Sequence, residues 1–176
     1  GAAGGGKSYT LLMEALRNIE NPQYGGVIFR RTNPMIIMEG GLWDKSCELY
    51  THCKGIPLYG NKQWKFPSGA TIRFCHMEHE KNKLDWNSSQ IPFIGFDEVT
   101  EFSSSMFWYM LSRNRSTSGI RPSMRAACNP DADSWVAELI KWWIDQNTGF
   151  PIPERSGVLR WFIRYHDELI WAMSRE

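Results

Sequence analysis

The chain of 176 residues is about the length of one domain, and 42% of its residues are apolar, enough for a buried core. The formal net charge of +1 gives no overall basic signal, so any nucleic acid would have to be bound through local basic patches. No apolar run approaches the ~20 residues that span a membrane, and the four cysteines lack disulfide-scaffold spacing, which favours a reduced intracellular compartment.

The first eight residues, GAAGGGKS, fit the phosphate-binding loop pattern G-x-x-x-x-G-K-[ST]. Glycines let the backbone curl so that successive N–H groups point at phosphate oxygens, and the helix that follows adds partial positive charge at its N-terminus. Lys7 would reach the β- and γ-phosphates, and Ser8 would hold Mg²⁺. The predicted nucleotide-binding residues are Gly1, Gly4, Gly5, Gly6, Lys7, Ser8 and Tyr9.

A strand normally precedes such a loop, and this chain starts with the loop itself, so we expect an N-terminally truncated fragment. Apolar residues at helical spacing then predict a helix over 11–19, which Asn21-Pro22 ends. The apolar run Val27-Ile28-Phe29 predicts a strand that ends at Arg30-Arg31-Thr32. A loop, a helix and a strand in this order begin an α/β unit with parallel strands.

The middle of the chain predicts a helix over 42–50 and a β-hairpin whose strands, 63–66 and 71–74, flank Pro67-Ser68-Gly69-Ala70. The continuous apolar run from Ile91 to Phe96 is typical of a strand that is buried on both faces of a sheet. Together with the first unit, these elements predict an α/β fold with a mainly parallel sheet and additional β-hairpins.

The second half continues with a helix capped within Ser103–Ser105, a strand over 124–128 and a helix from Asp133 that carries an apolar stripe to Ile144. Gly149 to Pro153 form a stiff connector, and the alternating residues from Val158 onward predict a terminal hairpin. We therefore expect one domain over residues 1–150, with residues 151–176 as a connector and hairpin that continue it.

The strand over 91–96 is followed directly by Asp97-Glu98, which is the Walker B pattern. Open α/β sheets bind their ligands at the carboxyl ends of the strands, where these carboxylates would lie beside the phosphate loop. Asp97 would bind Mg²⁺, and Glu98 would orient and deprotonate the attacking water as a general base. The second carboxylate favours hydrolysis over transfer to an acceptor.

Asn129 follows the strand over 124–128, so its amide would lie close to the γ-phosphate if that strand neighbours the Walker B strand. There it could report whether the γ-phosphate is present. The alternative reading of Asn129-Pro130 is an ordinary turn. A zinc site at Cys75, His76 and His79 is a further alternative, although no paired cysteine spacing supports it.

The order of these motifs resembles the ATPase domain of phage terminase large subunits, over nearly the whole chain. The resemblance is carried by GAAGGGKS at 1–8, FRRT at 29–32, FPSGATI at 66–72, FIGFDEVTEF at 93–102, LSRNRS at 111–116 and Asn129-Pro130. It implies a P-loop NTPase of the ASCE type, a three-layer sandwich around a mainly parallel sheet from which the first strand is missing. The family's C-terminal nuclease domain is also absent from these residues.

The resemblance implies a motor that uses ATP and Mg²⁺ to pump double-stranded viral DNA into a procapsid. Lys7 and Ser8 take the place of the Walker A pair, Asp97 and Glu98 that of the Walker B pair, and Asn129 falls in the coupling motif. The implied partners are double-stranded DNA, a homo-oligomeric ring (a pentamer by resemblance), the portal protein and the small terminase subunit. The implied location is the cytoplasm of an infected bacterial host.

Basic residues in the motifs are candidates for contacts with phosphate, DNA or a neighbouring subunit: Arg30, Arg31, Arg113 and Arg115. An arginine supplied by a neighbour can stabilise charge in the transition state, and Arg113 is the candidate catalytic arginine. Relatives often carry an Arg followed by Gln-Gly just before the Walker B strand. This chain has Lys81 to Ser88 there, so the identity of an arginine finger stays open.

Two other classes of function compete with the packaging ATPase. The first is another P-loop enzyme, such as a helicase-type ATPase or a nucleotide kinase, and Asp97-Glu98 disfavours the kinase. The second is a non-catalytic DNA-binding or assembly module, which predicts no stabilisation by nucleotide.

Overall fold

The computed structural model describes residues 5–129, 131–166, 168–172 and 174. The chain divides into two compact units, Gly1–Val136 and Ala137–Glu176. This division lies within helix α5 (Trp135–Ile140). The expectation of one domain over residues 1–150 that residues 151–176 continue stays a prediction. The predicted helix is shorter than expected, because the chain passes at Ile140 into a single 3₁₀ turn over Lys141–Trp143.

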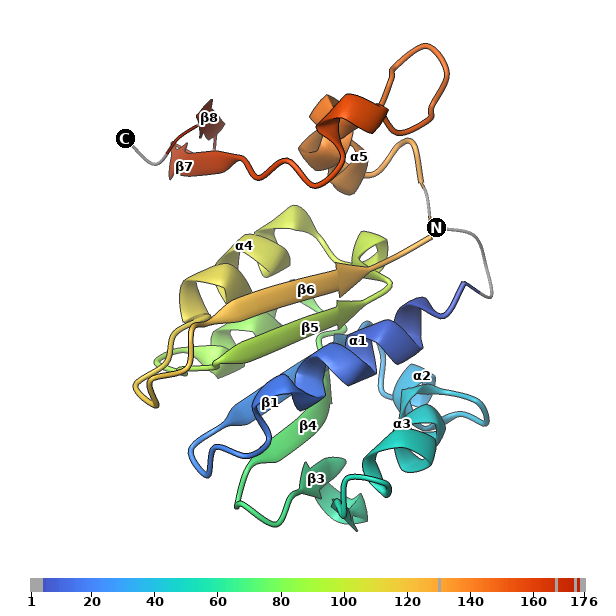
Figure 1. Ribbon diagram of the computed structural model, residues 1–176, viewed down its shortest axis with the longest axis vertical. Coiled ribbons are helices and arrows are strands. Elements are labelled where there is room, and N and C mark those ends of the chain that lie inside the picture. Colours follow the sequence, from blue (N-terminus) through green and yellow to red (C-terminus); the bar gives the residue numbers. More distant parts are fainter. Residues whose placement is uncertain (1–4, 130, 167, 173, 175–176) are drawn as a thin grey trace. The chain divides into compact units, whose positions relative to one another are not determined.

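The first unit is built on a six-stranded sheet in the order β2-β3-β4-β1-β5-β6 (Figure 1). Strands β4, β1, β5 and β6 are parallel, and β2, β3 and β4 are antiparallel neighbours, so the sheet is mixed but mostly parallel. The strands are β1 (Gly25–Arg30), β2 (Ile56–Leu58), β3 (Gln63–Lys65), β4 (Thr71–His76), β5 (Phe93–Asp97) and β6 (Ser123–Ala127).

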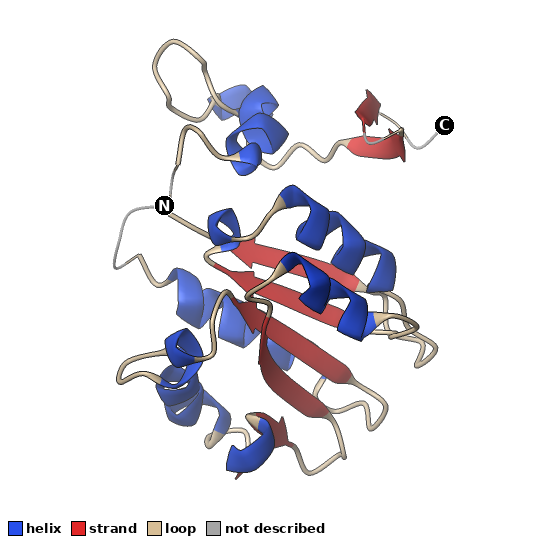
Figure 2. Cartoon of the chain, turned by 180° about the vertical axis from the view of Figure 1, so that it is seen from behind, coloured by secondary structure: helices blue, strands red, loops and turns tan. Residues whose placement is uncertain are grey.

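Helices lie on both faces of this sheet, with α1 on one side and α4 on the other (Figures 1 and 2). The α-helices of the first unit are α1 (Lys7–Ala15), α2 (Pro34–Ile37), α3 (Leu42–Tyr50), α4 (Ser104–Arg113) and the start of α5. Its 3₁₀ turns are η1 (Leu16–Asn18), η2 (Tyr59–Asn61), η3 (Glu80–Trp86) and η4 (Val99–Glu101). The Ser103 hydroxyl accepts the Met106 N–H at 3.1 Å, which confirms the predicted cap of α4.

Alternating side chains of the strands build two apolar cores. Ile28 and Phe93 face the core that contains α1 and α3, and Phe29 and Phe96 face the core that contains α4 and Trp86 of η3. All five residues of β5 are buried, which confirms the prediction of a strand covered on both faces. Gly95 lets α1 approach β5 closely, since a Cβ there would lie 3.3 Å from the Leu11 side chain.

The predicted hairpin is confirmed, because β3 pairs with β4 in antiparallel register. Its Trp64 ring packs between Trp43 and Tyr50 of α3, with ring centroids 5.6 Å from each. This contact fixes the antiparallel half of the sheet to α3 and to the rest of the first core.

The second unit is described by itself. It contains η5 (Lys141–Trp143), η6 (Pro153–Arg155) and the antiparallel pair β7 (Trp161–Tyr165) and β8 (Glu168–Ala172), which confirms the predicted terminal hairpin. The Arg160 guanidinium lies over Trp142 and Trp171, with its Cζ 4.7 and 4.3 Å from the two ring centroids.

Over the described part of the chain, every helix is too short or too polar to cross a bilayer.

Candidate functional site

The carboxyl ends of the parallel strands β1, β5 and β6 meet at one edge of the sheet, where open α/β sheets bind their ligands. Arg30 ends β1, Asp97 ends β5, and Glu98 follows it. Asn129 comes two residues after the end of β6. The first turn of α1 lies at the same edge, since Lys7 and Ser8 make hydrogen bonds to these residues.

The start of α1 has the features of an anion site. Gly6, the N-cap residue, has φ +71°, a left-handed conformation that favours glycine. No side chain of the described residues caps the helix, and its first turn carries no acidic residue. The N–H groups of this turn and the helix dipole are therefore directed at the edge of the sheet. Gly5 and Gly6 belong to the predicted phosphate loop, whereas Gly1 and Gly4 lie outside the described residues.

Asp97 connects α1 to β1 through its two carboxylate oxygens. The Ser8 hydroxyl donates to Oδ1 at 3.1 Å, and Arg30 Nε lies 3.0 Å from Oδ2. The second contact is an ion pair whose orientation is not that of a hydrogen bond, so Oδ2 is buried with no hydrogen-bond donor among the described residues. A buried carboxylate oxygen in this state is suited to bind a further electropositive group.

Burial raises the pKa of Asp97, and the charge of Glu98 adds to this, whereas Arg30 and the Ser8 hydroxyl lower the pKa in part. The charged carboxylate is thus costly for the folded protein at neutral pH. The folded state holds the proton of Asp97 more tightly than the unfolded state does. The contribution of Asp97 to stability therefore decreases as the pH rises above 3.8, the ordinary pKa of an aspartic acid side chain.

Asp97→Asn is therefore expected to leave the melting temperature at neutral pH equal to or above that of the wild type. The amide oxygen of the variant can still accept the hydrogen bond from the Ser8 hydroxyl. Arg30 retains its ion pair with the Glu101 carboxylate, which lies 3.7 Å from Nη1. Thermal melts of both proteins across the acid and neutral range measure this, and the advantage of the variant should grow as the pH rises. A melting temperature below that of the wild type at neutral pH would contradict it.

Glu98, Asn129 and Lys7 form a second set of contacts. The backbone N–H and the side-chain amide of Asn129 donate to the two Glu98 carboxylate oxygens at 3.1 and 3.2 Å. Lys7 Nζ donates to the Asn129 Oδ1 at 3.0 Å. Glu98 has φ 54° and ψ 59°, a left-handed conformation that costs a non-glycine residue about 1–2 kcal/mol. The strained backbone thus belongs to the residue whose carboxylate Asn129 contacts.

The oxygen ligands fit Mg²⁺ bound together with a nucleotide. Ser8 and Asp97 supply a hydroxyl and a carboxylate, and Mg²⁺ usually takes one or two protein oxygens together with waters and substrate phosphates. The described residues contain no group of three His, Cys, Asp or Glu side chains that could hold a metal by themselves. The donor set therefore does not resemble a structural zinc site.

Two charged residues at this edge were not singled out from the sequence. Lys45, in the first half of α3, lies close enough to lower the pKa of Asp97 through its charge. Burial raises the pKa of Glu101, whereas the Arg30 guanidinium lowers it. Lys45 lies outside the motifs, and Glu101 lies within the motif at 93–102 without a role assigned to it; the position of α3 and η4 beside the carboxyl ends of the strands points to both.

The remaining predicted residues lie in three places. Tyr9 directs its hydroxyl to Glu48 of α3, a contact made at an exposed site. Arg113 ends α4 and lies over the Tyr109 ring, and its carbonyl accepts the Ile91 N–H just before β5. Arg113 is thus at the amino end of β5, away from Asp97, and its catalytic role stays a prediction. Arg115 is near it, with Nη2 3.4 Å from the Ser89 carbonyl.

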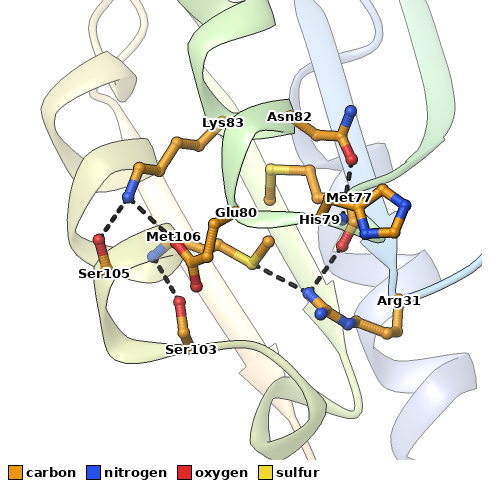
Figure 3. A network of polar contacts seen from close by, with 9 residues as sticks. All are labelled: Arg31, Met77, His79, Glu80, Asn82, Lys83, Ser103, Ser105 and Met106. Atoms are coloured by element: carbon orange, nitrogen blue, oxygen red, sulfur yellow. Dashed lines mark hydrogen bonds and ion pairs between the residues drawn. The ribbon is translucent and has the colours of Figure 1, made fainter.

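Arg31 takes part in a polar network with residues of η3 and α4 (Figure 3). Its Nη1 lies 2.9 Å from the Met77 carbonyl oxygen and 3.1 Å from the Met106 sulfur. In the same network Lys83 contacts Glu80 and Ser105. The two consecutive arginines at the end of β1 therefore have different partners. Arg30 contacts Asp97 of β5, and Arg31 contacts Met106 of α4.

Solved structures show similar folds. The chain aligns with the large terminase of a thermophilic bacteriophage at a TM-score of 0.58 and 14% identity, covering 77% of this chain and 34% of that chain. It aligns with the N-terminal domain of the DNA packaging ATPase from bacteriophage phi29 at a TM-score of 0.56 and 12% identity, covering 96% of this chain and 84% of that chain. It aligns with the Phi-28 gp11 DNA packaging motor at a TM-score of 0.53 and 12% identity, covering 96% of this chain and 53% of that chain.

No curated protein matches the sequence, and the chain spans only about a third of the length of the thermophilic phage terminase. The family comparison covers far more of this chain. Residues 1–173 match the model described as terminase large subunit, T4likevirus-type, N-terminal. The chain therefore belongs to the T4-type terminase large subunit family and corresponds to its N-terminal region.

Proposed function

We propose that this chain hydrolyses ATP with Mg²⁺ and that the hydrolysis drives double-stranded viral DNA into a procapsid. The observation that carries the proposal is the meeting of three motifs at one sheet edge. Lys7 contacts Asn129, Asn129 contacts Glu98, and Ser8 contacts the adjacent Asp97. A chain of the terminase family with this arrangement has the groups needed to bind a triphosphate and to activate water.

The residues of α1 would bind the triphosphate. N–H groups at the start of α1 and the Lys7 ammonium would neutralise phosphate charge, and Ser8 and Asp97 would hold Mg²⁺. When bound, Mg²⁺ would offset the negative charge that develops on the phosphoryl group. Arg30 would keep the Asp97 carboxylate in position from the β1 side, since its Nε lies 3.0 Å from Oδ2. The fold we propose for this chemistry is the P-loop NTPase sandwich.

Glu98 would act as the general base that orients and deprotonates the attacking water. Asn129 donates to both oxygens of Glu98 and accepts from Lys7, so it links the base to the cation that would contact the γ-phosphate. Loss of the γ-phosphate would free Lys7 and change the contacts of Asn129. This is a physical basis for the coupling role proposed for Asn129.

The proposed partners follow from the family and the structural neighbours. Two neighbours are titled as a DNA packaging motor and a viral genome packaging motor assembly. By analogy we propose that this chain acts on double-stranded DNA in a homo-oligomeric ring, together with a portal protein and a small terminase subunit. The proposed place of action is the cytoplasm of an infected bacterium.

Lys7→Ala is expected to abolish most of the stabilisation by ATP and Mg²⁺, because it removes the cation that we propose contacts the phosphates. A ligand at a hundred times its Kd stabilises the folded state by about 2.7 kcal/mol, and thermal melts with and without ATP and Mg²⁺ measure that shift. Lys81→Ala, which removes one exposed lysine from η3, is the matched control and should keep the full shift.

Three results would contradict the proposal. Absence of a nucleotide shift in the wild type would favour a non-catalytic module, and equal shifts in Lys7→Ala and wild type would remove Lys7 from the site. Transfer of the phosphoryl group to a nucleoside, in place of release of free phosphate, would favour a nucleotide kinase.

A further inference from the structure

One face of the antiparallel half of the sheet carries polar and basic side chains. In the β3–β4 register Lys65 lies opposite Thr71, and Gln63 lies opposite Arg73. In the β2–β3 register Ile56 and Leu58 lie opposite Lys65 and Gln63. Directly paired residues project from the same side of a sheet. We call this side the hairpin face; it consists of Ile56, Leu58, Gln63, Lys65, Thr71 and Arg73.

The hairpin face is open to solvent in the described structure. The residues between its members on β3 and β4, Trp64 and Ile72, are fully buried on the opposite side, against the core that contains α3. Lys65 and Arg73 are exposed, and Ile56 is 63% exposed. On this side the Arg73 guanidinium lies 5.3 Å from the ring centroid of Trp86 in η3.

The segment that carries the hairpin face contains no acidic residue. The segment 49–77, which forms β2, β3, β4 and their turns, has no Asp or Glu, although the chain as a whole is nearly neutral. It carries Lys54, Lys62, Lys65 and Arg73. None of the ion pairs between described residues involves these four side chains.

Lys62, which precedes β3, lies close enough to the Cys75 thiol of β4 for its charge to act on that thiol. Burial raises the pKa of the Cys75 thiol, whereas the charge of Arg73, its hydrogen bond to the thiol and the charge of Lys62 lower the pKa in part. Cys75 lies two residues after Arg73 on β4 and so projects from the same side.

The spacing of the cations suits a polyanion. Lys65 lies opposite Thr71, so it is the diagonal neighbour of Arg73, about 7–8 Å away in an antiparallel pair. Like charges at this spacing repel, and an anion between them would remove that cost. Gln63 and Thr71, between and beside the two cations, can donate hydrogen bonds to phosphate oxygens without charge.

We propose that the hairpin face binds the phosphate backbone of duplex DNA. The choice of DNA among polyanions rests on the proposed function, since a packaging motor must hold DNA of any sequence. Lysine, arginine and neutral donors on a flat sheet contact phosphates and carry no base readout, which gives sequence-independent binding. An acidic surface of a neighbouring protein is the competing occupant, and the experiment below separates the two.

The test is the salt dependence of DNA affinity, measured by fluorescence anisotropy with a labelled duplex in the absence of nucleotide. The slope of log K against log salt is negative, and each lost phosphate contact reduces its magnitude by about 1. Lys65→Gln with Arg73→Gln should therefore reduce that magnitude by about 2. The matched control is Arg17→Gln with Arg121→Gln, which removes the same charge from η1 and from the loop before β6. Its slope should equal that of the wild type.

A charge-preserving variant and a thermal melt complete the design. Lys65→Arg with Arg73→Lys should keep the wild-type slope, and all variants should melt like the wild type because the changed side chains are exposed. Equal slopes for the hairpin-face variant and wild type would overturn the proposal. So would an equal loss in the control, absence of duplex binding, or binding of a polyglutamate peptide in place of DNA.

Phosphate release from ATP, measured without DNA, separates this proposal from the proposed function. Normal hydrolysis with an unchanged DNA slope in the hairpin-face variant would refute the DNA face alone. A reduced slope in a protein that does not hydrolyse ATP would refute the proposed enzyme and leave the DNA face standing.

Discussion

Glu98→Gln is expected to lower ATP turnover at saturating ATP and Mg²⁺ by about 10²–10⁴-fold, the usual contribution of a general base. The amide cannot accept a proton from water, so the chemical step loses its base. Its remaining oxygen can still accept one of the Asn129 hydrogen bonds, which join Asn129 to both carboxylate oxygens in the wild type. Nucleotide affinity should therefore change much less than turnover, and phosphate release together with ATP-induced thermal shifts measures both.

Glu101→Gln is the control for this prediction. Glu101 is a carboxylate at the same edge of the sheet and faces Arg30, 3.7 Å from its Nη1. Asn129 donates its hydrogen bonds to Glu98, and Glu101 has no proposed part in activating water. The change from carboxylate to amide at Glu101 should therefore leave turnover within a few-fold of the wild type. Equal turnover in Glu98→Gln and wild type would refute the base assignment, and equal losses in the two variants would show that only the charge at this edge matters.

The sequence was sufficient to predict the parallel core of the fold, and the reason is visible in β5. A strand that is covered on both faces must be apolar at every position, so Ile91 to Phe96 could be recognised without knowledge of its neighbours. Asp97 and Glu98 then had to lie at the carboxyl end of that strand. Ser8 was expected beside them from the phosphate-loop pattern, and Asn129 on the condition that its strand neighbours β5, which the pairing of β5 with β6 meets.

Residues outside motifs could not be placed in this way. Lys45 affects Asp97 because α3 packs through Trp43 and Tyr50 against the sheet, an orientation that only tertiary contacts determine. The position of Arg113 could have been inferred from topology. A helix that leaves the carboxyl end of β5 and runs back along the sheet must end at the amino edge, which is where Arg113 contacts Ile91.

Trp64→Ala is expected to have the largest effect on stability, a loss of about 3–5 kcal/mol in the free energy of unfolding, typical of removing a buried large aromatic ring. Trp64 is fully buried, and its ring centroid is 5.6 Å from the centroids of both Trp43 and Tyr50. Its Nε1 also donates to the Ser46 hydroxyl at 2.9 Å. Urea denaturation followed by circular dichroism measures the loss.

Two control substitutions separate packing from the loss of any tryptophan. Trp161→Ala changes a residue that is 42% exposed on β7 and should cost much less than Trp64→Ala. Trp64→Phe keeps a ring in the core and gives up the bond to Ser46, so its cost should lie between the two. Equal costs for Trp64→Ala and Trp161→Ala would show that the contact between β3 and α3 does not stabilise the fold.

Strand β3 places Trp64 and Lys65 on opposite sides of the sheet. Substitutions at these two neighbouring residues should therefore have different effects on stability and on DNA affinity. Loss of Trp64 should lower stability and, by loosening β3 against α3, also disturb the spacing between Lys65 and Arg73 and weaken DNA binding. Loss of the two charges should weaken DNA binding without any change in stability. A DNA affinity in Trp64→Ala that equals the wild type under folding conditions would show that the hairpin face does not depend on the rigid register of β3 and β4.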